Sequence, residues 1–266
     1  MDRVNHTFVI CAYQESRFLE ECILSLKKQT VLSEIIMATS TPNDYIREMA
    51  LKYEIPLYIN TGEKGIVQDW NFAYRQAKTR YVTIAHQDDV YEKEYTRVLL
   101  GAMEKSEHPL IGFTDYREIR NGVIVDKSTM LRIKRWMLWP LSYNIFRKSR
   151  FVRRRILSLG CPICCPSVMY HKENLPKQIF KPGYRSDQDW QAWERLSRIK
   201  GEFVYVNKKL TLHRIHEEST TTAILGDNAR RREDYEMFLK FWPPVIAKLL
   251  GKLYSKSEKS NDLTKN

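Results

Sequence analysis

The sequence predicts an α/β protein whose sheet is mostly parallel and flanked by helices. Short runs of apolar, β-favouring residues such as 8–13 recur along the chain, and they are typical of strands buried on both faces. Between these runs, apolar residues recur at the spacing of an amphipathic helix. Strands and helices that alternate at this pace build βαβ units with parallel strands. A length of 266 residues suits one sizeable domain of this class with appendages.

The first hundred residues contain four expected strands with helices between them. Each strand candidate is an apolar run that stops at polar or turn-forming residues. The turn-like segments 39–44 and 62–65 separate successive units. The expected strands are 8–13, 34–38, 57–59 and 81–84, and the expected helices are 18–26, 46–50, 70–77 and 95–103.

The second half is expected to complete the sheet. Asn121-Gly122 lies between apolar residues and is a hairpin signal, because both residue types accept a positive φ. Residues 245–254 place lysines on one face and apolar residues on the other, which predicts an amphipathic helix. The further expected strands are 110–114, 167–170, 203–206 and 210–213, and a further helix is expected over 190–196.

The composition limits the classes of partner and compartment. Lys and Arg number 44 against 32 Asp and Glu, a net charge of +12. This excess predicts an anionic partner such as nucleic acid, a phosphate-bearing small molecule or anionic lipid. Five cysteines, an odd number, argue against a disulfide framework and for a reducing compartment. With no signal-peptide pattern and no apolar run near the ~18 residues of a membrane span, we expect a cytoplasmic protein, soluble or peripheral.

The polar cluster His86-Gln87-Asp88-Asp89 directly follows the strand 81–84. A buried strand that ends in this way delivers polar side chains to the carboxyl edge of an open α/β sheet, where ligands bind. Two adjacent carboxylates repel each other unless a positive charge lies between them. A hard divalent cation that itself carries phosphate oxygens would satisfy both. The alternative interpretation is a solvated loop or a helix N-cap.

Taken in order, these elements resemble the family-2 inverting glycosyltransferases of the GT-A fold, of the type that builds bacterial cell-surface polysaccharides. The resemblance covers about residues 4 to 220 and rests on five blocks in the correct order. The blocks are 8–15, similar to the opening strand; 84–89, similar to D-x-D; 166–169, similar to the acceptor-side strand; 189–196, similar to the helix after the E-D pair; and 214–219, similar to the closing R-x-H block.

Three positions depart from the family pattern. His86 replaces the first Asp of D-x-D, and Gln188 replaces the Glu of the E-D pair. Thr39-Ser40 replaces the Asp-Asp pair usually found after the second strand, one of which typically holds the nucleobase in the family. These departures leave the donor nucleotide open, whereas carboxylates for a metal and a base remain.

The resemblance implies that a divalent cation, Mn²⁺ or Mg²⁺, neutralises the departing diphosphate. Asp88 would be its principal ligand, and Asp89 a second ligand or an orienter of the first. His216 would complete the coordination or contact the diphosphate, unless it is a hydrogen-bonded structural histidine.

The resemblance also implies a carboxylate base for the acceptor hydroxyl. Asp189 is the expected base, with Asp187 as its substitute, although a helix cap is the alternative for Asp189. An ordinary Asp with a pKa near ~3.9 is a weak base. Burial beside Trp190 should therefore raise the pKa of Asp189.

Twelve residues are expected to contact the substrates. Tyr13 and Glu15 would flank the nucleoside, and the hydroxyls of 39–41 would face its base. Asp69 and Asn71 would point at the donor sugar, unless they are surface helix residues. The full set is Ala12, Tyr13, Glu15, Thr39, Ser40, Thr41, Lys64 (a phosphate contact), Asp69, Asn71, His86 (facing the ribose or metal, unless it is structural), Gln87 and Trp190.

The segment 128–158 is basic and aromatic and contains no acidic residue. Such a composition is typical of a membrane interface, where each cation near an anionic leaflet contributes ~1 kcal/mol. Arg153, Arg154 and Arg155 are expected to contact lipid, so reversing their charges should release the protein from anionic vesicles. The alternative is a basic surface that stays solvated or binds nucleic acid. Cys161, Cys164 and Cys165 lack the further ligands of a zinc site, and we expect ordinary buried cysteines.

We expect residues 1–225 to form the GT-A-type domain, with a nucleotide-sugar-binding half at 1–105 and an acceptor-binding half at 106–225. Residues 226–266 would form a basic helical tail with a disordered end. The expected function is metal-dependent, inverting transfer of a sugar from a nucleotide-diphosphate sugar to a polysaccharide or polyprenyl-linked saccharide. It would take place at the cytoplasmic face of the cell membrane, on an anionic membrane surface, with no nucleic acid as partner.

Two other functions are compatible with the sequence. A sugar-phosphate nucleotidylyltransferase shares the architecture and the metal, but residues 12–16 lack the glycine-rich loop of that class. A non-catalytic nucleic-acid or membrane-binding module would show salt-dependent affinity for RNA or DNA and would have no use for Asp189.

Overall fold

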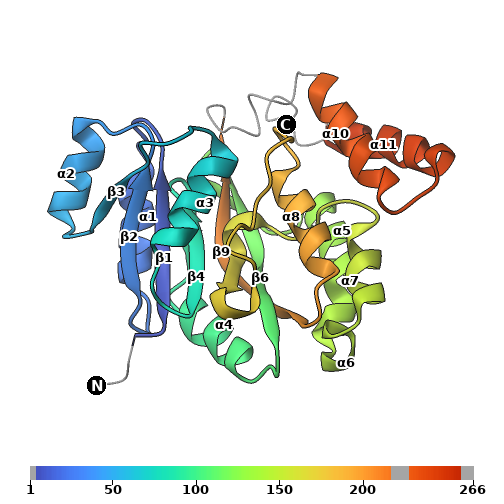
Figure 1. The fold of residues 1–266 in the computed structure, drawn as a ribbon, viewed down its shortest axis with the longest axis horizontal. Coiled ribbons are helices and arrows are strands. Elements are labelled where there is room, and N and C mark those ends of the chain that lie inside the picture. The colour runs from blue at the N-terminus through green and yellow to red at the C-terminus, as the bar shows by residue number, and fades with distance from the viewer. Residues whose placement is uncertain (1–3, 217–227, 259–266) are drawn as a thin grey trace.

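Nine strands form one mixed sheet in this computed structural model, which describes residues 4–216 and 228–258 (Figure 1). The strand order is β3-β2-β1-β4-β8-β6-β9-β5, and β7 pairs with β6. The parallel pairings are mostly long, whereas each antiparallel pairing joins two or three residues. The strands are β1 (His6–Ala12), β2 (Glu34–Thr39), β3 (Leu57–Ile59), β4 (Tyr81–His86), β5 (Val90–Tyr91), β6 (Pro109–Arg120), β7 (Val123–Val125), β8 (Val168–His171) and β9 (Glu202–Ile215).

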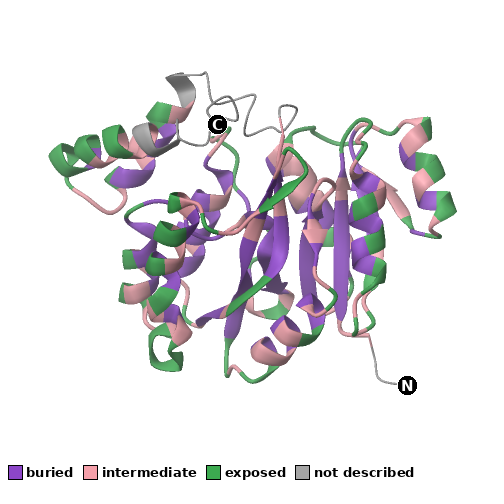
Figure 2. Ribbon diagram, turned by 180° about the vertical axis from the view of Figure 1, so that it is seen from behind, coloured by how far each residue is buried: buried purple, intermediate pink, exposed green. Residues whose placement is uncertain are grey.

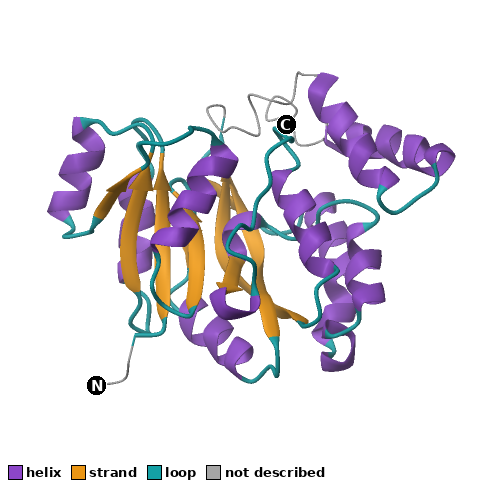
Figure 3. Ribbon diagram, viewed as in Figure 1, coloured by secondary structure: helices purple, strands orange, loops and turns teal. Residues whose placement is uncertain are grey.

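Helices cover both faces of the sheet (Figure 3). Alternate residues of β1 pack into two separate cores. Phe8 and Ile10 pack with α1 and α4 on one face, whereas Val9 packs with α3 and α8 on the other. The strands are buried, and the exposed residues lie mainly on the outer helices and loops (Figure 2). The helices are α1 (Leu19–Lys27), α2 (Asp44–Lys52), α3 (Ile66–Gln76), α4 (Tyr95–Glu104), α5 (Thr129–Leu138), α6 (Asn144–Arg147), α7 (Arg150–Leu157), α8 (Gln188–Ser197), α10 (Asn228–Leu239) and α11 (Pro244–Glu258), with 3₁₀ turns at Trp139–Ser142, Cys165–Ser167 and Lys172–Asn174.

The parallel part of the sheet brings three strand ends to one edge. β1 lies between β2 and β4 and runs parallel to both. Ala12 is opposite Thr39, and Cys11 is opposite His86. The last residues of β1, β2 and β4 therefore meet at the carboxyl edge of the sheet, which is the edge where the sequence places the site.

The sequence predicts two closing strands, 203–206 and 210–213, but they form one strand, β9. Val206 pairs with Thr114 and Lys209 with the next residue of β6, so a bulge in the register absorbs the two residues between them. Residues 207–209 at this bulge are polar and exposed, so the sequence suggested a break between two strands. The predicted hairpin between β6 and β7 is confirmed, with φ of 49° at Asn121 and 79° at Gly122.

The helices α10 and α11 pack on each other and on α8. The ring of Trp190 in α8 lies 5.1 Å from that of Phe238 and 5.7 Å from that of Tyr254. The helix α11 contains the predicted amphipathic helix and leaves Leu249 and Leu253 exposed. In the described ranges, no helix combines the length and the apolar character that a bilayer span needs. The disorder predicted for the chain end concerns 259–266, outside the described residues.

Candidate active site

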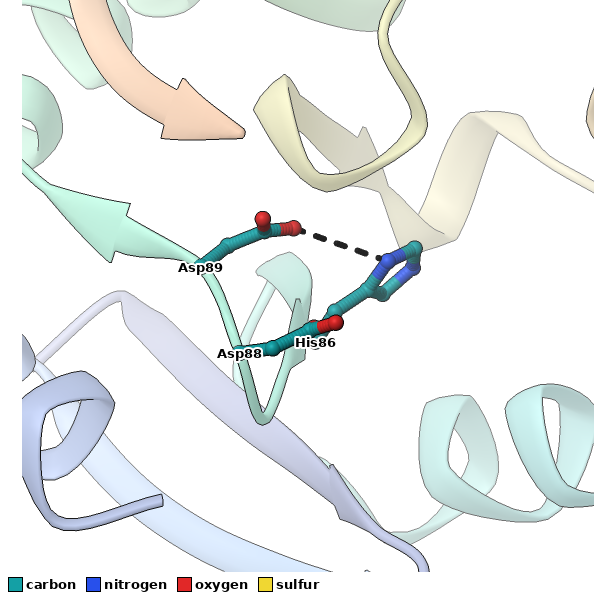
Figure 4. A group of neighbouring side chains, drawn as sticks. All are labelled: His86, Asp88 and Asp89. Atoms are coloured by element: carbon teal, nitrogen blue, oxygen red, sulfur yellow. Dashed lines mark ion pairs between the residues drawn. The ribbon is translucent and has the colours of Figure 1, made fainter. Parts of the chain in front are cut away.

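The end of β4 gathers three groups that could hold a metal ion. His86 is the last residue of β4, and the turn after it carries Asp88 and Asp89. One ligand atom from each lies within 4.8 Å of the others, and Figure 4 shows the His86 ring facing the Asp89 carboxylate with Asp88 beside them. Asp89 is fully buried, and neither its Oδ2 nor the Nε2 of His86 has a hydrogen-bond partner among the described residues. A buried polar atom that has no hydrogen-bond partner costs free energy. These carboxylate and imidazole groups could recover that cost by coordinating a divalent cation.

The end of β9 holds both carboxylates in place. Nδ1 of His213 lies 3.0 Å from Oδ1 of Asp89, and the same oxygen accepts the backbone N–H of Arg214 at 2.8 Å. Nε2 of His216 lies 3.0 Å from Oδ2 of Asp88. Each carboxylate therefore has one oxygen fixed by β9 or the residue after it, as outer partners orient metal ligands. Whether His216 also binds the metal stays a prediction, and the rest of its block, 217–219, lies outside the described residues.

Arg214 ties this strand end to α1. Its Nε donates to the backbone carbonyl of Asp88 at 2.9 Å, and a second nitrogen pairs with Glu21 at 2.5 Å. Its guanidinium lies 4.2 Å from the centroid of the Phe18 ring. The same ring contacts the imidazole of His216, with centroids 5.0 Å apart. Arg214 therefore positions the turn after β4.

Opposite charges shift the pKa values of two groups in this site, Asp88 and His213. Burial alone would raise the pKa of Asp88, but the hydrogen bond with His216 and the nearby histidine charges outweigh it and lower that pKa. Burial alone would lower the pKa of His213, but the Asp89 carboxylate raises it to about 9. An imidazolium at His213 thus faces the buried carboxylate of Asp89.

The loop after β1 lies next to the turn after β4. The side-chain amide of Gln87 accepts the backbone N–H of Tyr13 and donates to the backbone carbonyl of Tyr13, both at 2.9 Å. Gln87 therefore positions this loop, whereas the ring of Tyr13 is 55% exposed and open to a ligand. The side chain of Ala12 packs in the core, and Glu15 is exposed. Their predicted nucleoside contacts stay predictions.

The end of β2 is joined to α3 by hydrogen bonds. The hydroxyl of Ser40 donates to one oxygen of Asp69 at 2.7 Å, and the amide of Asn60 donates to the other at 2.8 Å. The hydroxyl of Thr39 accepts the backbone N–H of Thr41 at 3.0 Å. The sequence places these hydroxyls near the nucleobase, and the structure gathers them at the edge that also carries His86, Asp88 and Asp89.

The residues of α3 differ in what they face. Asn71 is buried: its Oδ1 accepts the backbone N–H groups of 179–180, both at 3.1 Å, and its amide donates to a carbonyl of the same pair at 2.8 Å. The predicted donor contact of Asn71 is therefore wrong, because its oxygen is already bonded twice. Trp70 stacks on His86 with centroids 5.1 Å apart and an angle of 15°. Lys64 is exposed in the loop before α3, so its phosphate contact stays a prediction.

Asp189 lies in the first turn of α8, and its surroundings suit a general base. Its Oδ1 accepts the backbone N–H of Trp190 at 2.6 Å, and its Oδ2 lies 3.7 Å from the thiol of Cys161. Burial raises the pKa of Asp189, as the sequence predicts, and the ammonium of Lys134 opposes the shift. A carboxylate with a raised pKa removes a proton more readily than an ordinary one.

Glu233 of α10 holds the loop that leads to Asp189. Its carboxylate accepts the backbone N–H groups of 185–187 at 2.8, 2.8 and 3.3 Å. Asp187, the expected substitute base, is only 4% exposed. Burial, the charge of Asp234 and the charge of Asp189 raise the pKa of Asp187 well above its usual range. Asp189 is the more accessible of the two acids.

The turn after β4 and Asp189 both influence the segment at Cys164 and Cys165. Burial raises the pKa of Cys164, and the charges of Asp89 and Asp189 both raise it further. The same two carboxylates raise the pKa of Cys165, which is also buried. The segment at Cys164 and Cys165 is therefore within electrostatic reach of both acids. All five cysteines carry thiols without disulfides, as predicted.

The predicted substrate contact of Trp190 is wrong. Trp190 is fully buried, and its indole N–H donates to the carbonyl of Leu157 at 3.0 Å. The C-terminal helices cover this face of α8 through Phe238 and Tyr254. Helical periodicity places Trp190 on an apolar face but does not reveal which element covers that face.

Most cations of 128–158 bind the protein itself. Arg153 is fully buried, donates to the carbonyl of Ile199 at 2.9 Å and lies 4.9 Å from the ring centroid of Phe203. Arg154 pairs with Glu194. The predicted lipid contacts of Arg153 and Arg154 are therefore wrong. The cations of this segment that are exposed and have no acidic partner within 4–216 and 228–258 are Arg132, Arg150 and Arg155.

Three positioning residues were missed from the sequence: His213, Glu233 and Trp70. His213 could have been found, since it directly precedes the R-x-H block on the same strand. Glu233 gave no local signal, because the backbone groups that it accepts lie 46 to 48 residues earlier in the chain.

Comparisons with known proteins agree with this fold. Residues 7–176 match the sequence profile of glycosyl transferase family 2. An uncharacterised glycosyltransferase of Haemophilus influenzae is 22% identical over 228 residues, which are 80% of this chain and 66% of that protein.

Solved structures share the architecture at low sequence identity. Residues 1–349 of S. aureus TarS in complex with UDP-GlcNAc superpose with a TM-score of 0.61 at 16% identity, over 88% of this chain and 64% of that one. The mannosyltransferase PcManGT from Pyrobaculum calidifontis, in complex with GDP-Man and Mn²⁺, gives 0.59 at 13% identity, over 94% and 69%. The chain thus spans about two thirds of the length of these relatives, and their likeness confirms the predicted GT-A fold.

Proposed function

The chain belongs to glycosyl transferase family 2, and we propose that it is a metal-dependent, inverting glycosyltransferase that uses a nucleotide-diphosphate sugar. One observation carries this proposal. Oδ2 of Asp89 is buried without a hydrogen-bond partner in the described chain, and Nδ1 of His86 lies 3.6 Å from it, at the carboxyl edge of the sheet. Such atoms are expected where a cation and the diphosphate it carries would bind.

The proposed donor is a sugar linked to a nucleoside diphosphate. Two proteins of the same fold were solved with such donors, UDP-GlcNAc in TarS and GDP-Man with Mn²⁺ in PcManGT. In this chain the exposed ring of Tyr13 and the hydroxyls of 39–41 would meet the nucleoside. Both segments end strands of the same parallel unit as β4, so they would place the diphosphate near Asp88.

Asp88 and Asp89 would hold Mn²⁺ or Mg²⁺, which when bound would neutralise the departing diphosphate as a Lewis acid. His213 and Arg214 fix one oxygen of Asp89, and His216 fixes one oxygen of Asp88. These contacts orient both carboxylates before a ligand arrives, so little reorganisation is needed on binding.

Asp189 would take the proton of the acceptor hydroxyl. The hydroxyl oxygen then forms the new bond to the anomeric carbon, while the bond from that carbon to the phosphate oxygen breaks and the diphosphate leaves with the electron pair. A single displacement of this kind inverts the anomeric centre. The half-buried position and raised pKa of Asp189 suit it to this step.

The proposed acceptor is a polysaccharide or a lipid-linked saccharide at the cytoplasmic face of the membrane. Trp136, Trp139 and Phe151 are 70%, 58% and 71% exposed on the segment that carries Arg132 and Arg150. A hollow of about 490 Å³ lies against both tryptophans. Exposed aromatic rings with cations favour an anionic lipid surface. We also propose that 1–105 bind the donor and that 106–225 bind the acceptor.

The family match removes the support for both rivals. A nucleotidylyltransferase would belong to another family, and a non-catalytic module would have no need of the orientation that β9 gives to Asp88 and Asp89.

The test is thermal unfolding of the full chain with and without UDP and Mn²⁺. We expect the two together to raise the melting temperature, and Asp88→Ala to abolish the shift. Glu173→Ala is the matched control, because Glu173 is an exposed acid that pairs with Arg80 just before the opposite end of β4. No shift with UDP, GDP or other nucleoside diphosphates, or an unchanged shift in Asp88→Ala, would contradict the proposal.

A further inference from the structure

We propose that His86 is itself a ligand of the cation held by Asp88 and Asp89, and that its imidazole makes the site select a first-row transition-metal ion over Mg²⁺. The inference rests on the proposed function, since that function requires a cation at this turn. It goes further by assigning the third ligand and the class of metal.

The position of the His86 ring supports a shared ion. Its Nδ1 lies 3.6 Å from Oδ2 of Asp89, which is too long for a hydrogen bond. Two ligand atoms that each lie about 2.1 Å from one metal ion are about 3.0 Å apart at a right angle and about 4.2 Å apart when opposite. The observed separation falls between these limits, so one ion could bind both atoms with little movement.

The orientation of the ring is fixed from outside the site. Trp70 stacks on His86 at 5.1 Å, nearly parallel, and itself packs against Phe180 at 4.9 Å. The side chain of Asn71 in turn holds the backbone of 179–180. This packing restricts the imidazole to the region of the two carboxylates without using either ring nitrogen. A ring held in this way loses little entropy on binding a metal.

The carboxylates of Asp88 and Asp89 are also held in place by contacts from outside the site. Oδ1 of Asp89 is bonded to His213 and to the backbone of Arg214, which leaves Oδ2 without a hydrogen-bond partner in the part of the chain that the structure describes. One oxygen of Asp88 is bonded to His216. The site therefore offers two carboxylate oxygens and one imidazole nitrogen, a mixed donor set.

This donor set favours a transition-metal ion on chemical grounds. Mg²⁺ prefers oxygen ligands, holds its water tightly and depends on negative charge for affinity. A neutral imidazole in place of a carboxylate removes one such charge and adds a nitrogen. First-row transition ions bind nitrogen more strongly, in the order Mn²⁺, Fe²⁺, Co²⁺. We therefore expect affinity to rise from Mg²⁺ to Mn²⁺ to Co²⁺.

The first test is spectroscopic and compares the wild type with three variants. Spin-echo electron paramagnetic resonance of the full chain with Mn²⁺ and UDP should show ¹⁴N modulation from a coordinated imidazole. The modulation should disappear in His86→Asp and in His86→Gln, and it should persist in His216→Gln. Bound Mn²⁺ without nitrogen modulation in the wild type, or modulation that survives His86→Asp, would overturn the inference while leaving the proposed function standing.

The second test measures selectivity by calorimetric titration of Mg²⁺, Mn²⁺ and Co²⁺ into the metal-free full chain with UDP. We expect Mg²⁺ to bind at least tenfold more weakly than Co²⁺, and His86→Asp to narrow that ratio several-fold. His108→Asp is the matched control, since His108 is exposed and should leave the ratio unchanged. An unchanged ratio in His86→Asp would refute the selectivity. If no cation bound the wild type, the metal-dependent function would fail as well.

Discussion

The turn after β4 and the helix α7 both contain several charged residues close together in the sequence. The charged groups of α7 are largely bound to other groups of the protein, whereas the turn retains buried atoms without hydrogen-bond partners in the part of the chain that the structure describes. At the turn, Asp89 and His86 keep buried atoms without a partner among the described residues. In α7, Arg154 pairs with Glu194, and Arg155 lies 4.7 Å from the ring of Trp242. Concentrated charge alone therefore does not identify a binding surface. The informative feature is which polar atoms the folded chain leaves without a partner.

Arg153 belongs to α7 but shares the burial of Asp89. It is fully buried like Asp89, and its Nε and one terminal nitrogen lack partners within the described ranges. Burial lowers the pKa of Arg153 to about 10. Its charge instead faces the ring of Phe203 and the carbonyl of Ile199, and no group beside it forms a ligand set. A metal site requires several ligand atoms that point toward one position, as the side chains of His86, Asp88 and Asp89 do.

The largest expected effect is on catalysis and tests the functional side of the comparison. Asp189→Asn keeps the shape of the side chain but removes the base. We expect kcat to fall by roughly 10²–10⁴-fold, the contribution of a positioned base. Binding of UDP and Mn²⁺ should be unchanged. The measurement is initial-rate kinetics with the donor that a screen of nucleotide sugars identifies, together with thermal shift.

The pH dependence of this variant gives an independent check. Burial raises the pKa of Asp189, so the wild-type rate should fall as pH drops through that raised value rather than near the ordinary one. The folded state holds the Asp189 proton more tightly than the unfolded state. Wild-type stability should therefore fall relative to Asp189→Asn as pH rises from the unfolded pKa to the folded pKa. Loss of activity in Asp187→Asn but not in Asp189→Asn would mean that the base is misassigned.

The next effect is on stability and tests the structural side. Arg153→Glu would bury a carboxylate among apolar groups and close to Glu202, and we expect it to cost about 3–5 kcal/mol of unfolding free energy. Arg153→Met keeps the apolar stem and removes the buried charge, so it should cost far less. Urea unfolding followed by tryptophan fluorescence measures both.

The exposed neighbour Arg150 supplies the control. Arg150→Glu makes the same charge change one turn earlier on α7 and should alter stability by no more than about 0.5 kcal/mol. If Arg153→Glu were as stable as Arg150→Glu, the conclusion that the protein interior holds the charge of Arg153 would be wrong.

Much of the fold and the core of the site could be predicted from the sequence. The apolar run 81–84 that stops at His86 marks a strand end, and parallel βαβ units bring such ends to one edge. That reasoning predicted polar groups at the carboxyl edge of the sheet, and the structure has Asp88 and Asp89 in the turn after β4, which pairs with β1. It needed only local periodicity and a general rule of topology.

The misplaced residues depend on contacts that periodicity does not specify. Trp190 is covered by the helices that begin at Asn228 and Pro244, and Asn71 is bonded to backbone more than a hundred residues away. Gln87 has the polarity of a ligand contact but binds the backbone of Tyr13. Periodicity shows that a side chain is buried or polar, whereas the identity of its partner is set by tertiary packing.

The smallest expected effect concerns the cations of 128–158 that the fold leaves exposed. Arg132→Gln combined with Arg150→Gln should weaken binding to phosphatidylserine vesicles by about thirtyfold, since each cation contributes ~1 kcal/mol at an anionic leaflet. Sedimentation with liposomes at low salt measures this partition, and the effect should shrink as salt screens the charges. Arg47→Gln with Lys105→Gln makes the same change in net charge at exposed positions on α2 and just after α4. Equal losses in the two double variants would show that net charge, and not this surface, governs binding, and the membrane part of the proposal would then be lost.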